Sequence, residues 1–406
     1  MNHRPILAIA ATACLLASAA ACGGNSKSSD SAPTTLTEMD YYEAPPQNTQ
    51  LPQLVDSCGK QAGVTVQHQQ LPRDQMMPKL LQEASARKMP DLTLIDNPDL
   101  QQFATTGALV ALDDAGLSTT GLYPSIVDAG KYNGKVYGIA PGVNGLALYY
   151  NKDLFTHAGL QPPATWPELT AAAQKLTHGK QYGIAFSAVG TEEGSFQFEP
   201  FFWTAGASLK QLDSPQAVQA LTFVDDLVHK GYASKSVVNW SQADVNDQFA
   251  AGNAAMMVNG PWQLPVLTKK TGLNFGIVPI PGPTPADKPV TPLGGEVWAV
   301  GHSNPAREAK AIAVVKCLLG ADLSLQWSKA AGYLSSNTTA AEQQGKDDPN
   351  LAAFVAELAT ARARTADLGT GYPKASQALY TALQSALAGG TAPQAALAKA
   401  QQDAAS

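Results

Sequence analysis

Short apolar runs and longer amphipathic segments alternate along the first hundred residues of the chain. Residues 35–42, 64–69 and 92–95 are typical of strands, and the segments around 51–58 and 76–86 have helical spacing. In the first of these helices Leu51, Leu54, Val55 and Cys58 follow the i, i+3, i+4, i+7 pattern, which predicts one buried face. This strand–helix–strand–helix order predicts an α/β fold, with a mainly parallel sheet covered by helices on both faces.

The second half of the chain repeats this style. Residues 182–186, 254–258 and 297–300 are strand-like, and 214–230 and 305–319 are helix-like. Ser214 followed by Pro215 indicates a helix start, with a capping hydroxyl and proline at the first helical position, and Gly231 indicates its end. No internal repeat is evident. A chain of 406 residues with 45% hydrophobic residues is long enough for two cores.

The N-terminus has the features of an export signal. His3 and Arg4 precede an apolar stretch at 6–17, which is shorter than the ~20 residues of a membrane-spanning helix. Small residues at 19–21 then precede Cys22. We therefore expect a signal peptide at 1–21. Cys22 and the residues after it resemble the acylation site of bacterial lipoproteins, although Ala19 stands where that pattern has leucine. The resemblance implies lipidation of Cys22 and a flexible tether at 22–33; ordinary cleavage with an incidental Cys22 is the alternative.

Charge excludes two classes of partner. Loss of residues 1–21 removes only Arg4 among the charged residues, so the formal net charge changes from -6 to -7. An acidic chain without a Lys/Arg block argues against nucleic acid or anionic lipid as the main partner.

One stretch, 137–176, carries a family resemblance. It reads YGIAPGVNGLALYYNKDLFTHAGLQPPATWPELTAAAQKL, and its YYNKD, AGL and P-x-T-W-x-E pieces keep the order and spacing found in solute-binding proteins of bacterial carbohydrate importers. These are the extracytoplasmic receptors of ATP-binding-cassette (ABC) transporters, in the cluster that includes maltose-binding protein. Further pieces at 249–256, 259–262, 294–300, 332–335 and 389–393 resemble the same family, so the likeness covers most of residues 35–400.

The resemblance implies a two-lobed periplasmic-binding-protein-like fold, in which each lobe is a mainly parallel sheet flanked by helices. We expect lobe 1 at 34–142 and 296–332, and lobe 2 at 143–295 and 333–406, joined by hinge crossings. Such a protein closes its lobes on a solute and performs no chemistry. The implied partners are a saccharide and the transmembrane permease subunits of an ABC importer. We expect a monomer at the outer face of the cytoplasmic membrane, held by its lipid anchor alone, with no cofactor and no metal.

Cys58 and Cys317 are the two cysteines of the folded part. They share no metal-ligand spacing, and an isolated pair in an exported protein is more often a disulfide than a reactive site. The family places both in the same lobe. We expect a Cys58–Cys317 disulfide, with two buried free thiols as the alternative.

Ligands of open α/β sheets bind beyond the carboxyl ends of the strands. A saccharide there needs aromatic rings for its C–H faces and polar side chains for its hydroxyl groups. In the first lobe the segments after the strands carry Tyr42, Glu43, Asp96 and Asn97. Because side chains alternate along a strand, only one of Tyr41 and Tyr42 should face the cleft, and we favour Tyr42. Asp96 is also explained by helix capping.

The resemblance supplies the remaining ligand-binding candidates. Asn144 lies in the first crossing and Tyr372 in a late loop, where Tyr333 is a further candidate. Glu193 and Phe196, with Ser195, precede the helix that carries Trp203. The others follow in the second lobe and the second crossing: Trp240, Trp262, Gly294, Gly295, Glu296 and Trp298. Core packing is the alternative for Trp203, Trp240 and Trp262, and Trp166 is expected to be structural.

The candidates include several carboxylates and no basic residue, which disfavours anionic solutes and leaves neutral or amino sugars. A glycerophosphodiester or another non-sugar polyol is an alternative ligand.

An enzyme is the main alternative class. The chain has no G-x-S-x-G, H-E-x-x-H, C-x-x-C or P-loop motif, and its histidines are scattered. A secreted glycosidase would need two carboxylates that flank the scissile bond, which sequence spacing cannot test. An exported adhesion module would instead present an exposed apolar patch.

Overall fold

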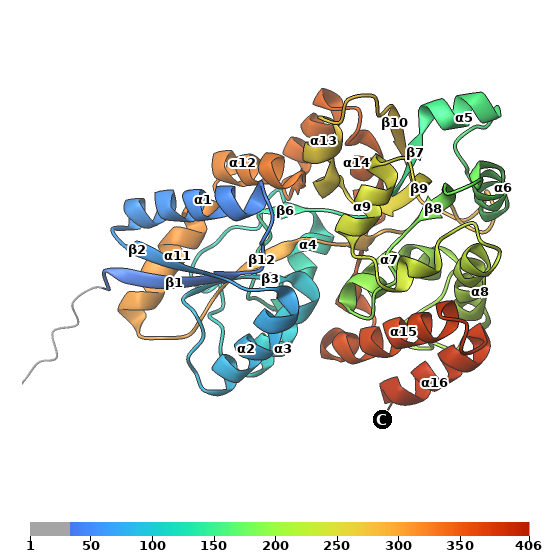
Figure 1. Ribbon diagram of the computed structural model, residues 1–406. Helices are drawn as coiled ribbons and strands as arrows, with labels where there is room; N and C mark the ends of the chain where they lie inside the picture. Colours follow the sequence, from blue (N-terminus) through green and yellow to red (C-terminus); the bar gives the residue numbers. More distant parts are fainter. Residues whose placement is uncertain (1–32, 406) are drawn as a thin grey trace, which may run out of the picture. The chain divides into compact units, whose positions relative to one another are not determined.

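The computed structural model describes residues 33–405; the predicted signal peptide, Cys22 and almost all of the tether lie outside them. Two four-stranded sheets organise this part of the chain (Figure 1). The first sheet has the order β12-β3-β1-β2 and contains β1 (Thr35–Asp40), β2 (Thr65–Gln70), β3 (Leu92–Asp96) and β12 (Glu296–Val300). β1 is parallel to β2 and β3, whereas β12 is antiparallel to β3.

Helices cover both faces of this sheet because its central strands bury alternate side chains on opposite sides. Leu94 and Trp298 pack with α1 (Gln47–Ala62), α11 (Pro305–Leu318) and α12 (Ala321–Ala331). Ile95 and Val297 pack on the other face with α2 (Arg73–Ser85) and α3 (Leu100–Thr105).

The second sheet has the order β10-β7-β9-β8 and contains β7 (Ala147–Asn151), β8 (Tyr182–Ala185), β9 (Ala254–Asn259) and β10 (Phe275–Val278). β8 is parallel to β9, and the other pairs are antiparallel. One face packs against α6 (Trp166–Leu176), α7 (Glu192–Thr204), α8 (Pro215–His229), α15 (Tyr372–Leu387) and α16 (Pro393–Ala405). The other packs against α9 (Gln242–Ala250), α10 (Leu264–Leu267), α13 (Thr338–Asp347) and α14 (Ala352–Leu358).

Shorter elements complete the described chain. They include α4 (Pro124–Ala129), α5 (Lys152–Ala158) and three two-stranded pairs: β4 (Lys131–Tyr132) with β5 (Lys135–Val136), β6 (Gly142–Val143) with β13 (Leu334–Ser335), and β11 (Pro292–Leu293) with β14 (Arg362–Ala363). Five 3-10 turns are η1 (Asn97–Asp99), η2 (Lys235–Val238), η3 (Pro261–Gln263), η4 (Arg364–Ala366) and η5 (Gly369–Gly371).

The predicted α/β class and two-lobed fold are confirmed, and the predicted strands and helices lie within a few residues of those observed. Ser214 caps α8 as expected, since its Oγ accepts a hydrogen bond from the backbone N–H of Ala217. Trp166 is structural, because its ring stacks on Phe223 and its Nε1 donates to the carbonyl of Pro281. The parallel prediction is only partly right, since β12, β7 and β10 form antiparallel pairs.

The segments that cross between the sheets lie side by side. Asn144 and Gly294 exchange two backbone hydrogen bonds, and β6 pairs with β13 close by. These pairings fix where the chain leaves one sheet and enters the other. The lobe boundaries given above stay a prediction.

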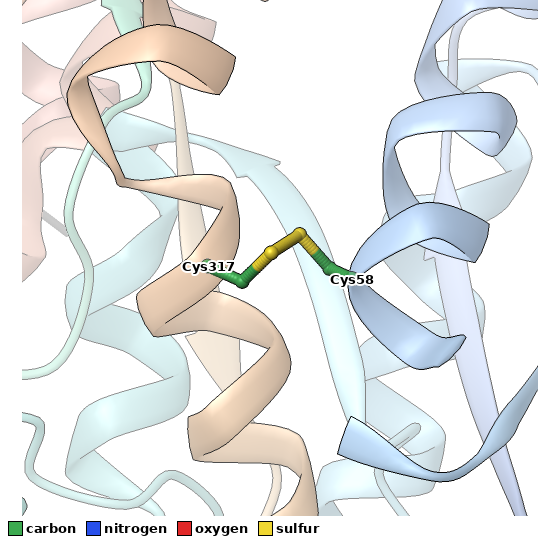
Figure 2. The surroundings of a disulfide bond; sticks show 2 residues. All are labelled: Cys58 and Cys317. Carbon is green, nitrogen blue, oxygen red and sulfur yellow. A yellow bond between two sulfur atoms is a disulfide. The ribbon is translucent and has the colours of Figure 1, made fainter. Parts of the chain in front are cut away.

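A disulfide joins Cys58 of α1 to Cys317 of α11 (Figure 2). Their Cα atoms lie 5.7 Å apart, within the usual range for a disulfide, and 259 residues of sequence separate them. Both helices cover the same face of the first sheet. The bond therefore joins α1, near the start of the described chain, to α11, which follows the return of the chain to this sheet at β12.

Loss of this bond should destabilise the protein. Because a long loop gains much chain entropy when it is opened, Cys58→Ser with Cys317→Ser should lower the free energy of unfolding by about 2–4 kcal/mol. Urea denaturation followed by circular dichroism measures the difference. Dithiothreitol should weaken the parent protein to the same level and leave the double variant unchanged; equal stability of both proteins without reductant would contradict the expectation.

Among the described residues no single helix is long and apolar enough to cross a bilayer, and only α11 and α12 together, bent by 68° at their junction, pass by length and composition.

Candidate functional site

A cavity of about 640 Å³ opens where strand ends of the two sheets meet the crossing segments. β1 and β3 are parallel, so Tyr41–Glu43, which follow β1, and Asp96, the last residue of β3, reach the same edge of the first sheet. β8 and β9 are parallel too, so the start of α7 and the η3 turn reach one edge of the second sheet. Both edges line the cavity, as the carboxyl ends of α/β sheets do in ligand sites.

Glu296 is the centre of a tyrosine cluster on the first-sheet side. Its carboxylate accepts hydrogen bonds from Tyr41 Oη at 2.6 Å, from Tyr42 Oη and, weakly, from Tyr333 Oη at 3.4 Å. All four side chains line the cavity. Burial and the nearby charge of Asp96 raise the pKa of Glu296. This cluster offers a flat, amphiphilic wall whose phenols are oriented by one carboxylate.

Two arginines hold a network of carboxylates at the base of the cavity. Arg364, of which the side chain is 2% exposed, forms a fork with both oxygens of Asp96 and donates to Glu192 Oε1 at 2.7 Å. Arg73 Nη2 donates to Asp96 at 3.1 Å and to Asp99 at 2.8 Å. Burial raises the pKa of Asp99 to about 7 against the opposing charge of Arg73. Because Asp96 ends β3 and Glu192 begins α7, the network connects the two sheets.

The first turns of α7 supply the opposite wall. Glu193 Oε1 accepts from the backbone N–H of Gln242 at 2.5 Å and from Ser187 Oγ at 3.2 Å. Phe196, one turn further along α7, faces the cavity with Trp262 at a centroid separation of 6.3 Å. Trp262 lies in η3 directly after β9. The two rings form the aromatic part of this wall.

Two glycines let the second crossing run close to the first. A Cβ on Gly294 would meet Asn144 Oδ1 at 2.0 Å and Phe196 Cζ at 3.0 Å. Gly295 has φ +113°, which L side chains rarely adopt, and a Cβ there would meet the carbonyl of Gly142 at 2.7 Å. Side chains at these two positions would therefore collide with the first crossing and with α7, so only glycine allows this close approach beside the cavity.

The structure brings most of the sequence candidates to this cavity. Ten of them line it: Tyr42, Glu43, Asp96, Asn144, Glu193, Phe196, Trp262, Gly294, Gly295 and Glu296. The remaining four, Asn97, Trp240, Trp298 and Tyr372, are outside its lining.

Each of these four has a structural role. Asn97 is 3% exposed, and its Nδ2 donates to the carbonyl of Gly295 at 2.8 Å, which braces the crossing. Trp298 is 1% exposed because it lies two residues further into β12 than Glu296, within the core of the first sheet. Tyr372 lies behind the lining, where its Oη donates to Glu192 Oε1 at 2.6 Å and lies 2.9 Å from Glu199 Oε1.

Trp240 packs against both faces of the second sheet's core, and its carbonyl accepts from Ser187 Oγ at 2.7 Å. Trp203 is core, which the sequence left open. Glu193, Ser195 and Phe196 do not precede the helix that carries Trp203 but belong to it.

Two expectations about the lining are wrong. Both Tyr41 and Tyr42 face the cavity, because β1 ends at Asp40 and strand alternation no longer governs the residues beyond it. The lining also contains basic residues, Arg73 and Arg364. Arg73 opens the helix that follows β2, so the carboxyl-edge rule alone would have found it. Arg364 begins the short η4 turn directly after β14, where no pattern in the sequence indicates it.

Sequence reasoning also missed a polar row on α9. Gln242 and Asn246 are four residues apart, so they share a face of that helix, and both line the cavity. Val245 and Phe249 carry the buried face. The helical spacing of Val245 and Phe249 places Asn246 at the border of the buried face. This spacing could have indicated Asn246 as a candidate from the sequence. Groups of three or more potential metal ligands do not occur in the described part of the chain.

The fold and cavity match a known family. The family model described as bacterial extracellular solute-binding protein matches residues 53–353, so the chain belongs to that family. A binding protein of Brucella abortus is 28% identical over 354 residues, which cover 82% of this chain and 84% of the relative. An ABC-transporter-binding protein of Deinococcus radiodurans is 27% identical over 299 residues, covering 68% of this chain and 70% of the relative.

Solved structures agree with this assignment. An ABC transporter solute-binding protein of Thermotoga lettingae bound with α-D-tagatose has a TM-score of 0.82 at 25% identity, covering 91% of this chain and 98% of that one. A ribitol complex of a solute-binding protein from Agrobacterium radiobacter has a TM-score of 0.80 at 23% identity, covering 92% of this chain and 98% of that one. The second likeness is one of fold.

Proposed function

We propose that this protein is an extracytoplasmic receptor that captures a mono- or oligosaccharide and delivers it to the permease of an ABC importer. The observation that carries the proposal is the cavity itself. Its lining combines aromatic rings with carboxylates, and it comes from both sheets. Its volume of about 640 Å³ falls within the ~300–1,000 Å³ of small-molecule sites. The tagatose-bound relative supports a sugar, and the ribitol-bound one supports a polyol as fold-level analogy.

The lining explains how binding would drive closure. A solute shifts a two-state equilibrium only by its difference in affinity for the two states. A sugar that stacks on Trp262 of the second sheet's edge and meets Tyr41 and Tyr42 of the first gains contacts to both lobes only when they approach. The receptor performs no catalytic step in this account, and the ATP hydrolysis belongs to partner subunits.

Lipid anchoring is part of the proposal. The small residues before Cys22 support cleavage there and acylation of its thiol, and the short apolar run supports a cleaved signal rather than a permanent span. The receptor would then work as a monomer at the outer face of the cytoplasmic membrane. Metabolic labelling with a palmitate analogue, with Cys22→Ala as control, tests this part independently of ligand binding.

A thermal-shift screen against a carbohydrate panel tests the receptor function. A cognate sugar should raise the melting temperature with concentration, because stabilisation grows as RT ln(1 + [L]/Kd). Trp262→Ala should weaken binding of that sugar by about 10–100-fold, since the stacking area is lost. Isothermal titration calorimetry measures this loss.

Trp240→Ala is the matched control, because Trp240 packs beside the second sheet outside the lining. It should lower stability while the affinity for the sugar stays within about threefold. Absence of any shift across monosaccharides, maltodextrins, amino sugars and polyols would refute the receptor function. Normal sugar binding by Trp262→Ala would refute only the stacking role.

A further inference from the structure

One acceptor of the cavity lining has no hydrogen-bond partner within the described residues. Asn246 is 5% exposed, lines the cavity, and none of those residues donates to its Oδ1. A buried carbonyl oxygen without a donor costs free energy unless a ligand supplies one. This orphan acceptor lies on α9, four residues after Gln242 and therefore on the same face.

Glu193 contacts the first turn of this helix, because its Oε1 accepts a hydrogen bond from the backbone N–H of Gln242. Both of its hydrogen bonds, from the backbone N–H of Gln242 and from Ser187, go to Oε1. Oε2 makes none, and no arginine, lysine or histidine forms an ion pair with Glu193 in the described chain. Burial raises the pKa of Glu193, opposed by its hydrogen bonds from Gln242 and Ser187 and by the nearby charge of Arg73. Glu193 and Asn246 both line the cavity, and Glu193 contacts the first turn of the helix that carries Asn246.

The positive charges of the lining are already committed. Arg364 is shared by Asp96 and Glu192, and Arg73 lies between Asp96 and Asp99. The unused N–H groups of Arg73 can serve the oxygens of a neutral hydroxyl, but its charge is matched by those two aspartates. The lining also contains four carboxylates that form no ion pair with any described residue: Glu43, Glu193, Asp247 and Glu296. The lining is therefore negative overall.

We propose that the solute is a saccharide with a protonated amine, whose ammonium group binds between Glu193 Oε2 and Asn246 Oδ1. This inference rests on the proposed receptor function and narrows its ligand class. An ammonium group has donors and no acceptor, which is what two unpaired acceptors require, and a hydroxyl group would leave the carboxylate charge unmatched. The aromatic rings of the lining add a further attraction, since cations are stabilised by ring faces.

Three matched sugar series test the ammonium site. The probes are glucosamine, galactosamine and mannosamine with the dimer and trimer of β-1,4-linked glucosamine, each compared with its N-acetyl form and its hydroxyl parent by calorimetry at pH 7. Because a charge-assisted hydrogen bond is about twice as strong as a neutral one, the best free-amine probe should bind at least about 10-fold tighter than both counterparts. Equal or tighter binding of the N-acetyl or hydroxyl form would overturn the inference.

Glu193→Gln locates the effect. The amide keeps an Oε1 acceptor for Gln242 and Ser187, so the fold of this wall should survive, while the negative charge is lost. The preference for the free amine over the hydroxyl parent should fall to about threefold or less. Glu342→Gln, on an exposed turn of α13, removes the same charge outside the cavity and should keep the full preference.

The outcomes separate the two proposals. A hydroxyl parent that binds well with no amine preference contradicts the ammonium site and leaves the sugar receptor standing. A preference that persists in Glu193→Gln contradicts the assigned residues. If neither these probes nor neutral maltodextrins produce a thermal shift, the receptor function and the ammonium site fall together.

Discussion

Arg364→Ala should lower the free energy of unfolding of the ligand-free protein by about 3–5 kcal/mol, the largest loss expected from any side chain of the site. Removal of one partner from a buried ion pair leaves the other charges buried without compensation, and this costs more than the pair itself contributes. Arg364 has a 2% exposed side chain and serves Asp96, Glu192 and the carbonyl of Leu293 at once. Urea denaturation at pH 7, followed by circular dichroism, measures the change.

Arg362→Ala is the control for this prediction. Arg362 lies two residues away, is about one-third exposed, pairs with Asp367 and lies over the Trp203 ring at 5.1 Å. Exposed ion pairs and cation–π contacts of this kind contribute about 1 kcal/mol each, so the loss should stay near 1–2 kcal/mol. Arg364→Lys should fall between parent and Arg364→Ala, because one ammonium group cannot reproduce the fork to Asp96. A loss under about 1 kcal/mol for Arg364→Ala would mean that the network is not stabilising.

Periodicity predicts which segments become elements but not in which direction they pair. β3 and β12 are both apolar runs whose side chains are buried on two faces, and the sequence indicates each as a strand. β12 pairs antiparallel to β3 because the chain returns to the first sheet after it has formed most of the second sheet. The residues of Glu296–Val300 do not indicate this direction. Local pattern therefore gives the elements, and the long connections decide the topology.

The same limit applies to the cavity. The rule that ligands bind beyond the carboxyl ends of strands predicted part of the lining correctly. It found Tyr42 and Glu43, which follow β1, and Asp96, which ends β3. The prediction that Trp298 binds the ligand was wrong, because residue type does not show how deeply a side chain is buried. Glu296 at the end of β12 reaches the cavity, whereas Trp298, two residues further along the strand, is buried in the core.

Arg364 was beyond sequence reasoning for another reason. It follows the short β14 strand, which pairs with β11, and it meets Asp96 across 268 residues of sequence. In the sequence alone, an arginine at such a short turn cannot be distinguished from a surface residue. Its neighbours Arg362 and Arg73 show that the chain's basic residues near the cavity work with carboxylates, which only the packed structure reveals.

Stability should fall as the pH rises from about 4.5 to 7, and Glu38 should be a principal cause. Glu38 lies in β1, is fully buried, and shares a hydrogen bond with His68 through Oε2 while Oε1 has no partner. Burial raises its pKa from 4.5 to about 7 despite the hydrogen bond from His68. The folded state thus binds a proton that the unfolded chain has already released over this interval. The slope of unfolding free energy against pH is negative wherever the folded state holds more protons.

Glu38→Gln should therefore be more stable than the parent at pH 8 by up to about 3 kcal/mol, at 1.36 kcal/mol for each pKa unit, and nearly equal to it at pH 4.5. Urea denaturation at pH steps from 4.5 to 8 measures both curves. Glu342→Gln, which removes an exposed carboxylate, should follow the parent curve.

His68 contributes in the same direction and must be separated from Glu38. The hydrogen bond to Glu38 raises the pKa of His68, so its stabilisation is present below the unfolded pKa near 6.5 and is lost as the pH rises through the folded value. In Glu38→Gln this contribution shrinks as well, because its first cause is removed. The variant should consequently flatten the pH dependence more than one carboxyl would. An unchanged slope in Glu38→Gln would mean that other buried acids cause the effect, such as Asp40, Asp99 and Glu199, whose pKa values burial also raises.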